Sequence, residues 1–216
     1  MCWSATADLV AGTCVVAIGV ACVARSRRAR DLPLAALPLL LGAHQVIESA
    51  VWRSEDGTGG PATVAWAVIA LPVLALWVPA GVFCAAPAPA RPRLTVPLAA
   101  GALTAAFLTY SLLTRPVTAE VRGHTLGYAL DLPHAALLLC GYLLATVGSL
   151  LLSADRWLRA LGLLVAVGAA LCAALWRLEF ISTWCAFAAA CSVVLLGWAR
   201  RGPPDPRPAV GSAPTD

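Results

Sequence analysis

The chain contains no lysine, because all 15 of its basic residues are arginine. A covalently bound retinal forms its Schiff base with a lysine, so the sequence excludes a retinal protein of that kind. Charge of either sign is also scarce, since only 12% of the 216 residues are charged. A chain with so few charges lacks the polar surface that a soluble domain of this size needs.

Several familiar catalytic motifs are absent as well. The sequence has no HExxH pair, no glycine-rich phosphate loop followed by lysine, and no GxSxG turn. These absences exclude the common zinc proteases, the nucleotide-driven pumps and the α/β-hydrolases. The eight cysteines are scattered without paired metal-ligand spacing, which is typical of small buried apolar side chains.

Long apolar runs fill most of the chain. Hydrophobic residues make up 60% of it, and its mean hydropathy is +0.82. Because a bilayer core of about 30 Å needs about 20 apolar residues per helix, we predict an all-α polytopic membrane helix bundle of about seven transmembrane helices. The candidate spans are 8–24, 32–52, 61–84, 94–114, 133–153, 157–176 and 180–199. Residues 1–201 would form this transmembrane domain, and residues 202–216 a disordered, proline-rich cytoplasmic tail.

The arginines alternate between the two ends of these spans. Arg25, Arg27, Arg28, Arg30, Arg91, Arg93, Arg156, Arg159, Arg200, Arg201 and Arg207 fall at one end, and Arg53, Arg115, Arg122 and Arg177 at the other. By the positive-inside rule the richer end is cytoplasmic. We therefore expect a multi-pass protein of the bacterial cytoplasmic membrane, with the N-terminus outside and the C-terminus inside. The net charge of +4 needs no nucleic-acid partner to explain it.

Two predicted spans open with the same three residues. Asp31-Leu32-Pro33 and Asp131-Leu132-Pro133 each place a capping carboxylate before a proline, which suits the first turn of a helix. The two spans enter from opposite sides, as an inverted repeat of three plus three helices requires. Two independently capped helices explain the same pattern.

The second span carries the most informative polar residues. His44, Glu48 and Trp52 recur at four-residue steps and share one face of the helix. An ionised acid at the centre of a membrane helix costs about 2.5 to 3.5 kcal/mol, so we expect this face to point into the bundle. It would form either a functional site or a polar contact that only holds helices together.

Other polar groups approach the same depth. At 1.5 Å per residue, Glu48 and His44 would lie about 6 Å and about 13 Å below the outer end of the span. Glu179 begins the last span from the same side, either as part of the site or as an acid in the first turn of a helix. The outer connection between Arg115 and Pro133 is expected to be a loop, and His134 follows it on the next helix.

The chain also resembles a known group of proteins. Met1-Cys2-Trp3-Ser4-Ala5, the segment Asp31-Leu32-Pro33-Leu34, the pattern His44-Gln45-x-x-Glu48 and the pairs Glu179-Phe180 and Trp184-Cys185 carry the resemblance. They are similar to those of an uncharacterised family of bacterial multi-pass membrane proteins that begin Met-Cys-Phe/Trp-Ser-Ala. The likeness covers most of the chain except the tail, and it implies no activity.

This resemblance directs attention to Cys2. If the initiator methionine is removed, the terminal amine and the thiol form a chelating pair on the outer side. A thiolate with imidazole and carboxylate groups suits zinc or copper, so the candidate metal ligands are His44, Glu48, Cys2 and His134. The thiolate is alternatively a nucleophile, or Cys2 and Trp3 only anchor the terminus in the interface.

Three functions remain open from the sequence. The first is a membrane protein with a polar pocket in the outer half of the bundle that binds a metal or small ligand, with His44, Glu48 and Glu179 as acid/base or relay groups in any catalysis. The second is a proton-coupled small-molecule transporter. The third is a structural or sensory membrane protein with no ligand, whose polar groups only lock helices together. In every case the lipid bilayer is an expected partner, and a nucleic acid is not.

Overall fold

A computed structural model describes residues 4–54, 60–122, 125–175 and 180–200, which are mostly helical. The helices are α1 Ala5–Arg25, α2 Leu32–Ala35, α3 Leu37–Val51, α4 Pro61–Val68, α5 Leu74–Ala85, α6 Thr95–Thr114, α7 Ala135–Leu143, α8 Ser149–Leu151, α9 Arg156–Leu175, α10 Phe180–Cys191 and α11 Val193–Ala199. The π-helical segments Ile69–Val73 and Leu144–Gly148 join α4 to α5 and α7 to α8. Each predicted span therefore coincides with a helix or a run of joined helices.

Five helical segments among the described residues are long and apolar enough to cross a membrane: Ala5–Arg25, Ala29–Val51, Pro61–Ala85, Pro92–Thr114 and Arg156–Ala174. Ala135–Leu151 and Ala186–Ala199 are apolar but shorter. These helices are compatible with a membrane protein. By length and composition they support five spans, where the sequence predicted about seven.

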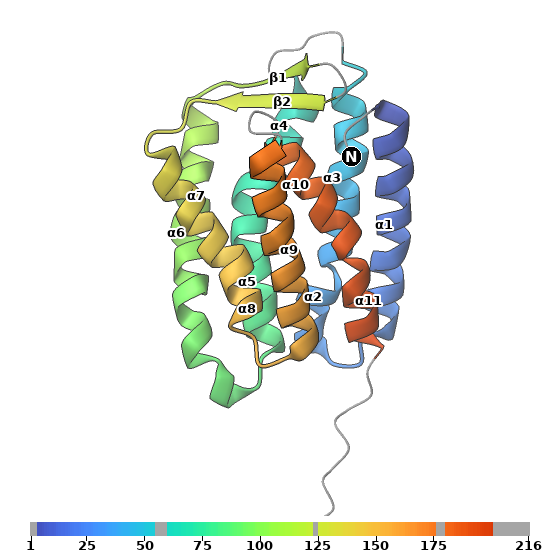
Figure 1. Ribbon diagram of the computed structural model, residues 1–216, viewed down its shortest axis with the longest axis vertical. Coiled ribbons are helices and arrows are strands. Elements are labelled where there is room, and N and C mark those ends of the chain that lie inside the picture. The colour runs from blue at the N-terminus through green and yellow to red at the C-terminus, as the bar shows by residue number, and fades with distance from the viewer. Residues whose placement is uncertain (1–3, 55–59, 123–124, 176–179, 201–216) are drawn as a thin grey trace, which may run out of the picture.

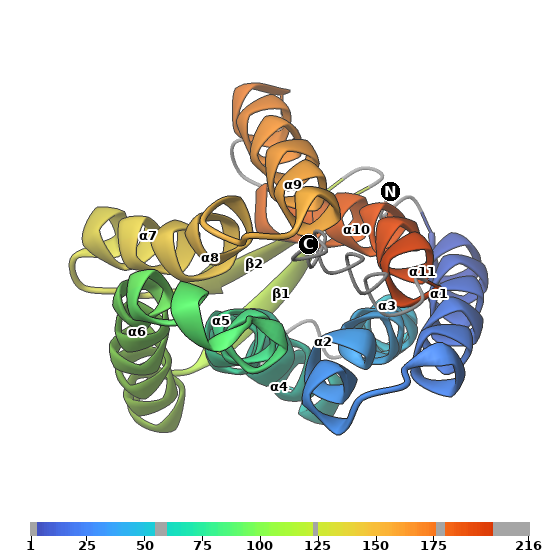
Figure 2. The same ribbon diagram turned by 90° about the horizontal axis from the view of Figure 1, so that it is seen from below.

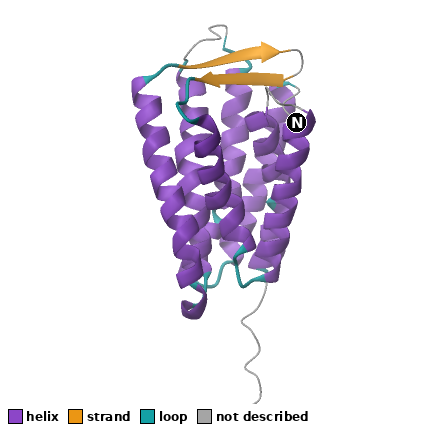
Figure 3. Ribbon diagram, turned by 60° about the vertical axis from the view of Figure 1, so that its left-hand side comes forward, coloured by secondary structure: helices purple, strands orange, loops and turns teal. Residues whose placement is uncertain are grey.

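The helices stand side by side, and a two-stranded sheet lies across one end of them (Figures 1 and 3). The connections from α1 to α2, from α5 to α6 and from α8 to α9 lie at the opposite end, where α11 also finishes (Figure 1). The arginine-rich connections of the sequence therefore share one end of the bundle. We call the two ends the hairpin end and the arginine end.

The sheet corrects the expectation of a loop between Arg115 and Pro133. Strand β1, Val117–Arg122, pairs antiparallel with β2, Thr125–Leu130, so that Val117 faces Leu130 and Arg122 faces Thr125. The prediction of an all-α chain therefore misses one hairpin, although the described chain is mostly helical. The hairpin follows from apolar residues that alternate with polar ones from Val117 to Arg122 and from the short Gly123-His124 connection in the sequence.

The two Asp-Leu-Pro segments do not form matching helix caps. Asp31 ends a 3₁₀ turn, and its carboxylate makes no capping hydrogen bond to α2. Asp131 instead pairs with Arg115 at 3.2 Å, across the base of the hairpin. The helix after it begins at Ala135, because His134 adopts a left-handed conformation with φ 57°. The prediction thus holds for the helix start at Asp31, which is the N-cap residue with Pro33 in the first turn, but it is wrong for the capping hydrogen bonds and for the helix start at Asp131.

Helices α1 and α3 pack closely through glycines, and they lie next to each other in Figures 1 and 2. A Cβ on Gly42 would lie 2.6 Å from the backbone nitrogen of Val16, and one on Gly19 would lie 2.6 Å from that of Leu39. No side chain fits there unless the backbones separate. This packing, which is common between membrane helices, fixes α3 against α1 from Leu39 to Val46.

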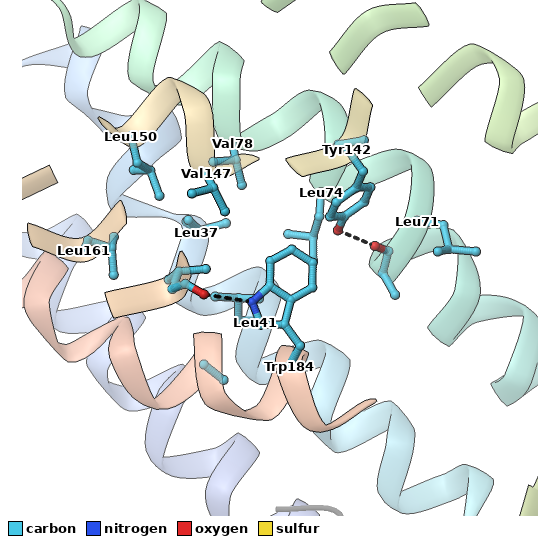
Figure 4. Close-up of a cluster of buried hydrophobic side chains, with 14 of the residues drawn as sticks. Leu37, Leu41, Leu71, Leu74, Val78, Tyr142, Val147, Leu150, Leu161 and Trp184 are labelled. Carbon is cyan, nitrogen blue, oxygen red and sulfur yellow. Dashed lines mark hydrogen bonds between the residues drawn. The ribbon is translucent and has the colours of Figure 1, made fainter. Parts of the chain in front are cut away.

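The middle of the bundle is an apolar core (Figure 4). Leu37 and Leu41 of α3 meet Leu74, Tyr142 and Trp184 around a cavity of about 60 Å³. The polar atoms of this core have partners: the Tyr142 hydroxyl donates to the Ala70 carbonyl at 2.6 Å, and the Trp184 indole donates to the Val165 carbonyl at 3.3 Å. Ala70 lies in the first π-helical segment, where the helical hydrogen bonds shift register.

Candidate functional site

The half of α3 nearer the hairpin end buries three polar side chains. His44 and Glu48 are completely buried, and Gln45 is 2% exposed. The face predicted from their spacing therefore points into the bundle, which confirms that prediction. The pattern His44-Gln45-x-x-Glu48 places all three within little more than one turn of a helix.

Gln45 lies between the other two side chains. Its amide nitrogen, Nε2, donates to Glu48 Oε2 at 3.4 Å and contacts His44 Nδ1 at the same distance. Both contacts are long for hydrogen bonds. In enzymes and binding proteins such contacts often shorten only when a ligand completes the site.

Two aromatic rings cover the cluster from the hairpin end. Trp66 of α4 lies 4.9 Å from the ring of His44 between centroids, and Tyr128 of β2 stacks on Trp66 at 3.5 Å, nearly parallel. The Tyr128 hydroxyl donates to Glu48 Oε1 at 3.4 Å. We call the set of His44, Gln45, Glu48, Trp66 and Tyr128 the α3 cluster. It combines one helix face, a second helix and the hairpin.

One tautomer of a neutral His44 fits these contacts. The Gln45 nitrogen faces both Glu48 Oε2 and His44 Nδ1. When Nδ1 accepts from this nitrogen, the proton of His44 lies on Nε2. His44 then offers an N–H donor to whatever lies beyond its Nε2.

Two donors of the α3 cluster are buried without an acceptor. His44 Nε2 and Trp66 Nε1 have no hydrogen-bond partner among the described residues. A buried polar group without a partner costs about 1 to 3 kcal/mol, so such groups call for an explanation. One explanation is a ligand that supplies an acceptor.

A second polar contact joins α1 to α3 near the same end. Asp8 is completely buried in α1, and its Oδ2 accepts a hydrogen bond from the Trp52 indole at 2.7 Å. The other carboxylate oxygen has no partner among the described residues. Trp52, which the sequence grouped with His44 and Glu48, thus binds Asp8.

The α3 cluster does not contain enough metal-binding side chains to form a metal site by itself. No group of three or more histidine, cysteine, aspartate or glutamate residues gathers within the described ranges, whereas zinc usually takes at least three protein ligands. Among the described residues, His44 and Glu48 are therefore two possible ligands of a metal ion and do not form a complete set.

The other predicted site residues fall elsewhere or outside the description. Cys2 and Glu179 lie outside the described residues, as do His124 and the tail from residue 201. His134 immediately precedes α7, and α7 and α3 lie on opposite sides of the bundle in Figures 1 and 2. The structure thus brings together His44 and Glu48, but it does not bring His134 to them.

Sequence reasoning missed two side chains at this end, Trp66 and Asp8. Trp66 was hidden inside an apolar run, and no local signal distinguishes it. Tyr128 was expected among the polar groups of the connection between Arg115 and Pro133, and the hairpin pattern places it in the middle of β2. Asp8 was taken as the first residue of a span, although a carboxylate one turn inside an apolar helix indicates burial.

Comparison with other proteins identifies a family to which no function is assigned. No curated protein and no solved structure was found to match the chain. Residues 1–210 match a family of unknown function, DUF6629. The match covers almost the whole sequence, including α3, α4 and the hairpin that build the α3 cluster. The chain therefore belongs to the DUF6629 family.

Proposed function

We propose that this protein is a multi-pass protein of the bacterial cytoplasmic membrane that binds a small molecule at the α3 cluster. His44 and Glu48 are the binding groups, and Tyr128 and Trp66 form the cover. The observation that carries the proposal is the buried Nε2 of His44, which lacks a partner in the described chain and lies on the same helix turn as the buried Glu48.

The chemistry of the cluster limits the ligand. Two N–H donors, on His44 and Trp66, call for an acceptor atom, while the carboxylate of Glu48 disfavours an anion. A neutral oxygen, as in a hydroxyl, ether or carbonyl group, satisfies both conditions. Such a ligand in contact with His44 and Glu48 would also lie beside an acid and a base, the arrangement that proton-transfer catalysis uses.

The topology expected from the sequence supports a ligand that comes from outside the cell. The hairpin end carries few arginines, and the arginine end carries most of them, so the positive-inside rule favours a cytoplasmic arginine end. Under this topology the short apolar segments Ala135–Leu151 and Ala186–Ala199 complete a set of seven spans. The α3 cluster then lies in the outer half of the membrane.

A metal ion is the second candidate ligand. It would take His44 and Glu48 together with Cys2, and it would supply a Lewis acid to the site. Gln45 would first have to turn its amide so that Oε1 accepts from His44 Nδ1, which frees Nε2. Glu179 remains a proposed third acid/base group in either case.

Proton-coupled transport is the alternative that one further observation favours. Tyr128, Glu48, Gln45 and His44 form a continuous series of polar contacts in a buried setting. Prolines and π-helical turns interrupt the neighbouring helices, for example at Pro72 within Ile69–Val73, and such breaks permit movement. This alternative predicts a flux that depends on pH and disappears in Glu48→Gln.

The test compares the wild-type protein with Glu48→Gln and His44→Ala after purification in a mild detergent. Native mass spectrometry detects a retained organic molecule, and elemental analysis of the same samples detects a metal. We expect a ligand of constant mass on the wild type and its loss from both variants. Circular dichroism checks that all samples keep their helices.

Ser149→Ala is the matched control, because Ser149 is also completely buried but lies on α8 and donates only to the Thr146 carbonyl. This variant should keep the ligand. If the wild type contains stoichiometric metal and His44→Ala loses it, the ligand of the site is a metal ion and not an organic molecule. Well-folded wild type with neither ligand nor metal, or variants that retain full binding, would contradict the proposal and leave a purely structural cluster.

A further inference from the structure

A cavity of about 400 Å³ lies between α1, α3, α9 and α10, beside the α3 cluster. Its volume is in the range of small-molecule sites. Gln45 borders it, and Gln45 is the residue whose amide contacts both His44 and Glu48. The cavity thus reaches the middle of the α3 cluster from the side of the bundle.

The walls of this cavity are apolar and uncharged. Small and aromatic side chains such as Val15 and Phe187 form most of them, and among the described lining residues only Gln45 and Thr183 carry oxygen or nitrogen in the side chain. A hydrophilic molecule would gain little along such a surface. An apolar chain would fit it, with a polar group reaching Gln45 at the inner end.

The cavity runs from the surface of the bundle to its interior. Cys14 and Ala190, which border it, are exposed, whereas Gln45 and Cys172 are 2% and 5% exposed. Cys14 lies in the middle of α1, a helix long and apolar enough to cross a membrane. The exposed end of the cavity therefore lies at a height where a membrane helix meets lipid tails, not water.

We infer that the ligand of the α3 cluster is an amphiphile that enters sideways from the bilayer. Its apolar chain lies in the cavity between α1 and α10, and its neutral oxygen head group binds at Gln45, His44 and Glu48. This inference rests on the proposed function and adds the class of ligand and its route. A long-chain alcohol, ester or ether has the required chemistry.

The test uses a long-chain fatty alcohol with a photoactivatable diazirine in its chain and the whole protein in lipid nanodiscs. After illumination, peptide mapping locates the label. We expect labelling of the α1 and α10 peptides that border the cavity and competition by an excess of unlabelled fatty alcohol. Ala190→Trp, which fills the exposed end, should lower labelling about tenfold, the equivalent of about 1.4 kcal/mol.

Ala17→Trp is the matched control, because Ala17 is exposed on α1 but does not border the cavity. It should leave the labelling unchanged. Two variants, Glu48→Gln and Gln45→Leu, test whether the head group binds at the α3 cluster. Each should lower labelling a few-fold to tenfold, because each removes about one hydrogen bond to the head group.

Several results would overturn the inference. Labelling spread evenly over the exposed helices, or unchanged in Ala190→Trp, would show that the cavity holds no specific chain. If Ala190→Trp removes the labelling but Glu48→Gln and Gln45→Leu do not, the cavity binds the apolar chain without help from the α3 cluster. A ligand on the α3 cluster that survives Ala190→Trp would refute the lateral route and leave the proposed function standing. Disulfide-linked dimers through Cys14 would show that a second copy covers the cavity.

Discussion

The two halves of α3 are buried to the same degree but held in different ways. Towards the arginine end, Leu37 and Leu41 pack into the apolar core, where the hydroxyl of Tyr142 makes a hydrogen bond of 2.6 Å. Towards the hairpin end, His44 and Glu48 make contacts of 3.4 Å, and donors are left over. The lengths overlap, since the Trp184 bond in the apolar core is 3.3 Å, so the difference lies in the two donors that the α3 cluster buries without a partner in the described chain. Such leftover donors indicate a place that stability did not shape.

The largest expected effect tests the apolar half. Leu161→Ala removes a side chain that is 3% exposed and borders the core cavity, and we expect it to lower the free energy of unfolding by about 2 to 5 kcal/mol. Leu163→Ala on the same helix changes a side chain that is 60% exposed and should have an effect below about 0.5 kcal/mol. Thermal and denaturant unfolding in detergent measures both. Equal effects would mean that the core is not packed as described.

A pair of tyrosines compares the two halves directly. Tyr142→Phe removes the 2.6 Å hydrogen bond to the Ala70 carbonyl and should cost about 1 kcal/mol of stability. Tyr128→Phe removes the 3.4 Å hydrogen bond to Glu48 and should cost less. Unfolding of the two variants under one set of conditions ranks them. A larger loss in Tyr128→Phe would show that the α3 cluster stabilises the fold and would remove the contrast.

The smallest expected change in stability is at His44. Phenylalanine keeps a ring beside Trp66 and removes a buried donor that has no partner in the described chain. It also removes the 3.4 Å contact with the Gln45 amide, whose nitrogen keeps its contact with Glu48. We therefore expect His44→Phe to change the free energy of unfolding by less than about 0.5 kcal/mol, or to raise it, while ligand binding is lost. Unfolding and native mass spectrometry on the same sample measure the two properties. Strong destabilisation would identify His44 as a structural residue.

Much of the bundle was predictable because hydropathy is a local property. The spans 8–24 and 94–114 coincide with α1 and α6 to within a few residues. The hairpin was missed because a long connection at the end of a helical bundle was read as a loop, although its alternating residues indicate strands. The failed caps at Asp31 and Asp131 have another cause, since a carboxylate takes the nearest cation or donor that the tertiary structure offers, and Asp131 takes Arg115.

The candidate site was predictable only in part. Helical spacing places His44 and Glu48 on one face, and the cost of burying them predicts that the face points inward. Their partners come from distant parts of the chain, so no spacing rule reveals that Trp66 lies beside His44 or that Tyr128, expected only at the same end of the bundle, contacts Glu48. Gln45 was visible in the sequence, but its position between the two ionisable groups and beside a cavity depends on the packing of α10 against α3.

The distance along the chain between Glu48 and its cover has a consequence for biosynthesis. Asp8 and Trp52, which tie α1 to α3, are 44 residues apart, whereas Glu48 and Tyr128 are 80 residues apart. Because a nascent chain folds from its N-terminus, the paired helices α1 and α3 are synthesised well before β2. During that interval α3 is in place while Glu48 lacks its contact from Tyr128. The hairpin then closes over a polar surface that already exists, and α10, which is synthesised later still, packs against both α3 and β2.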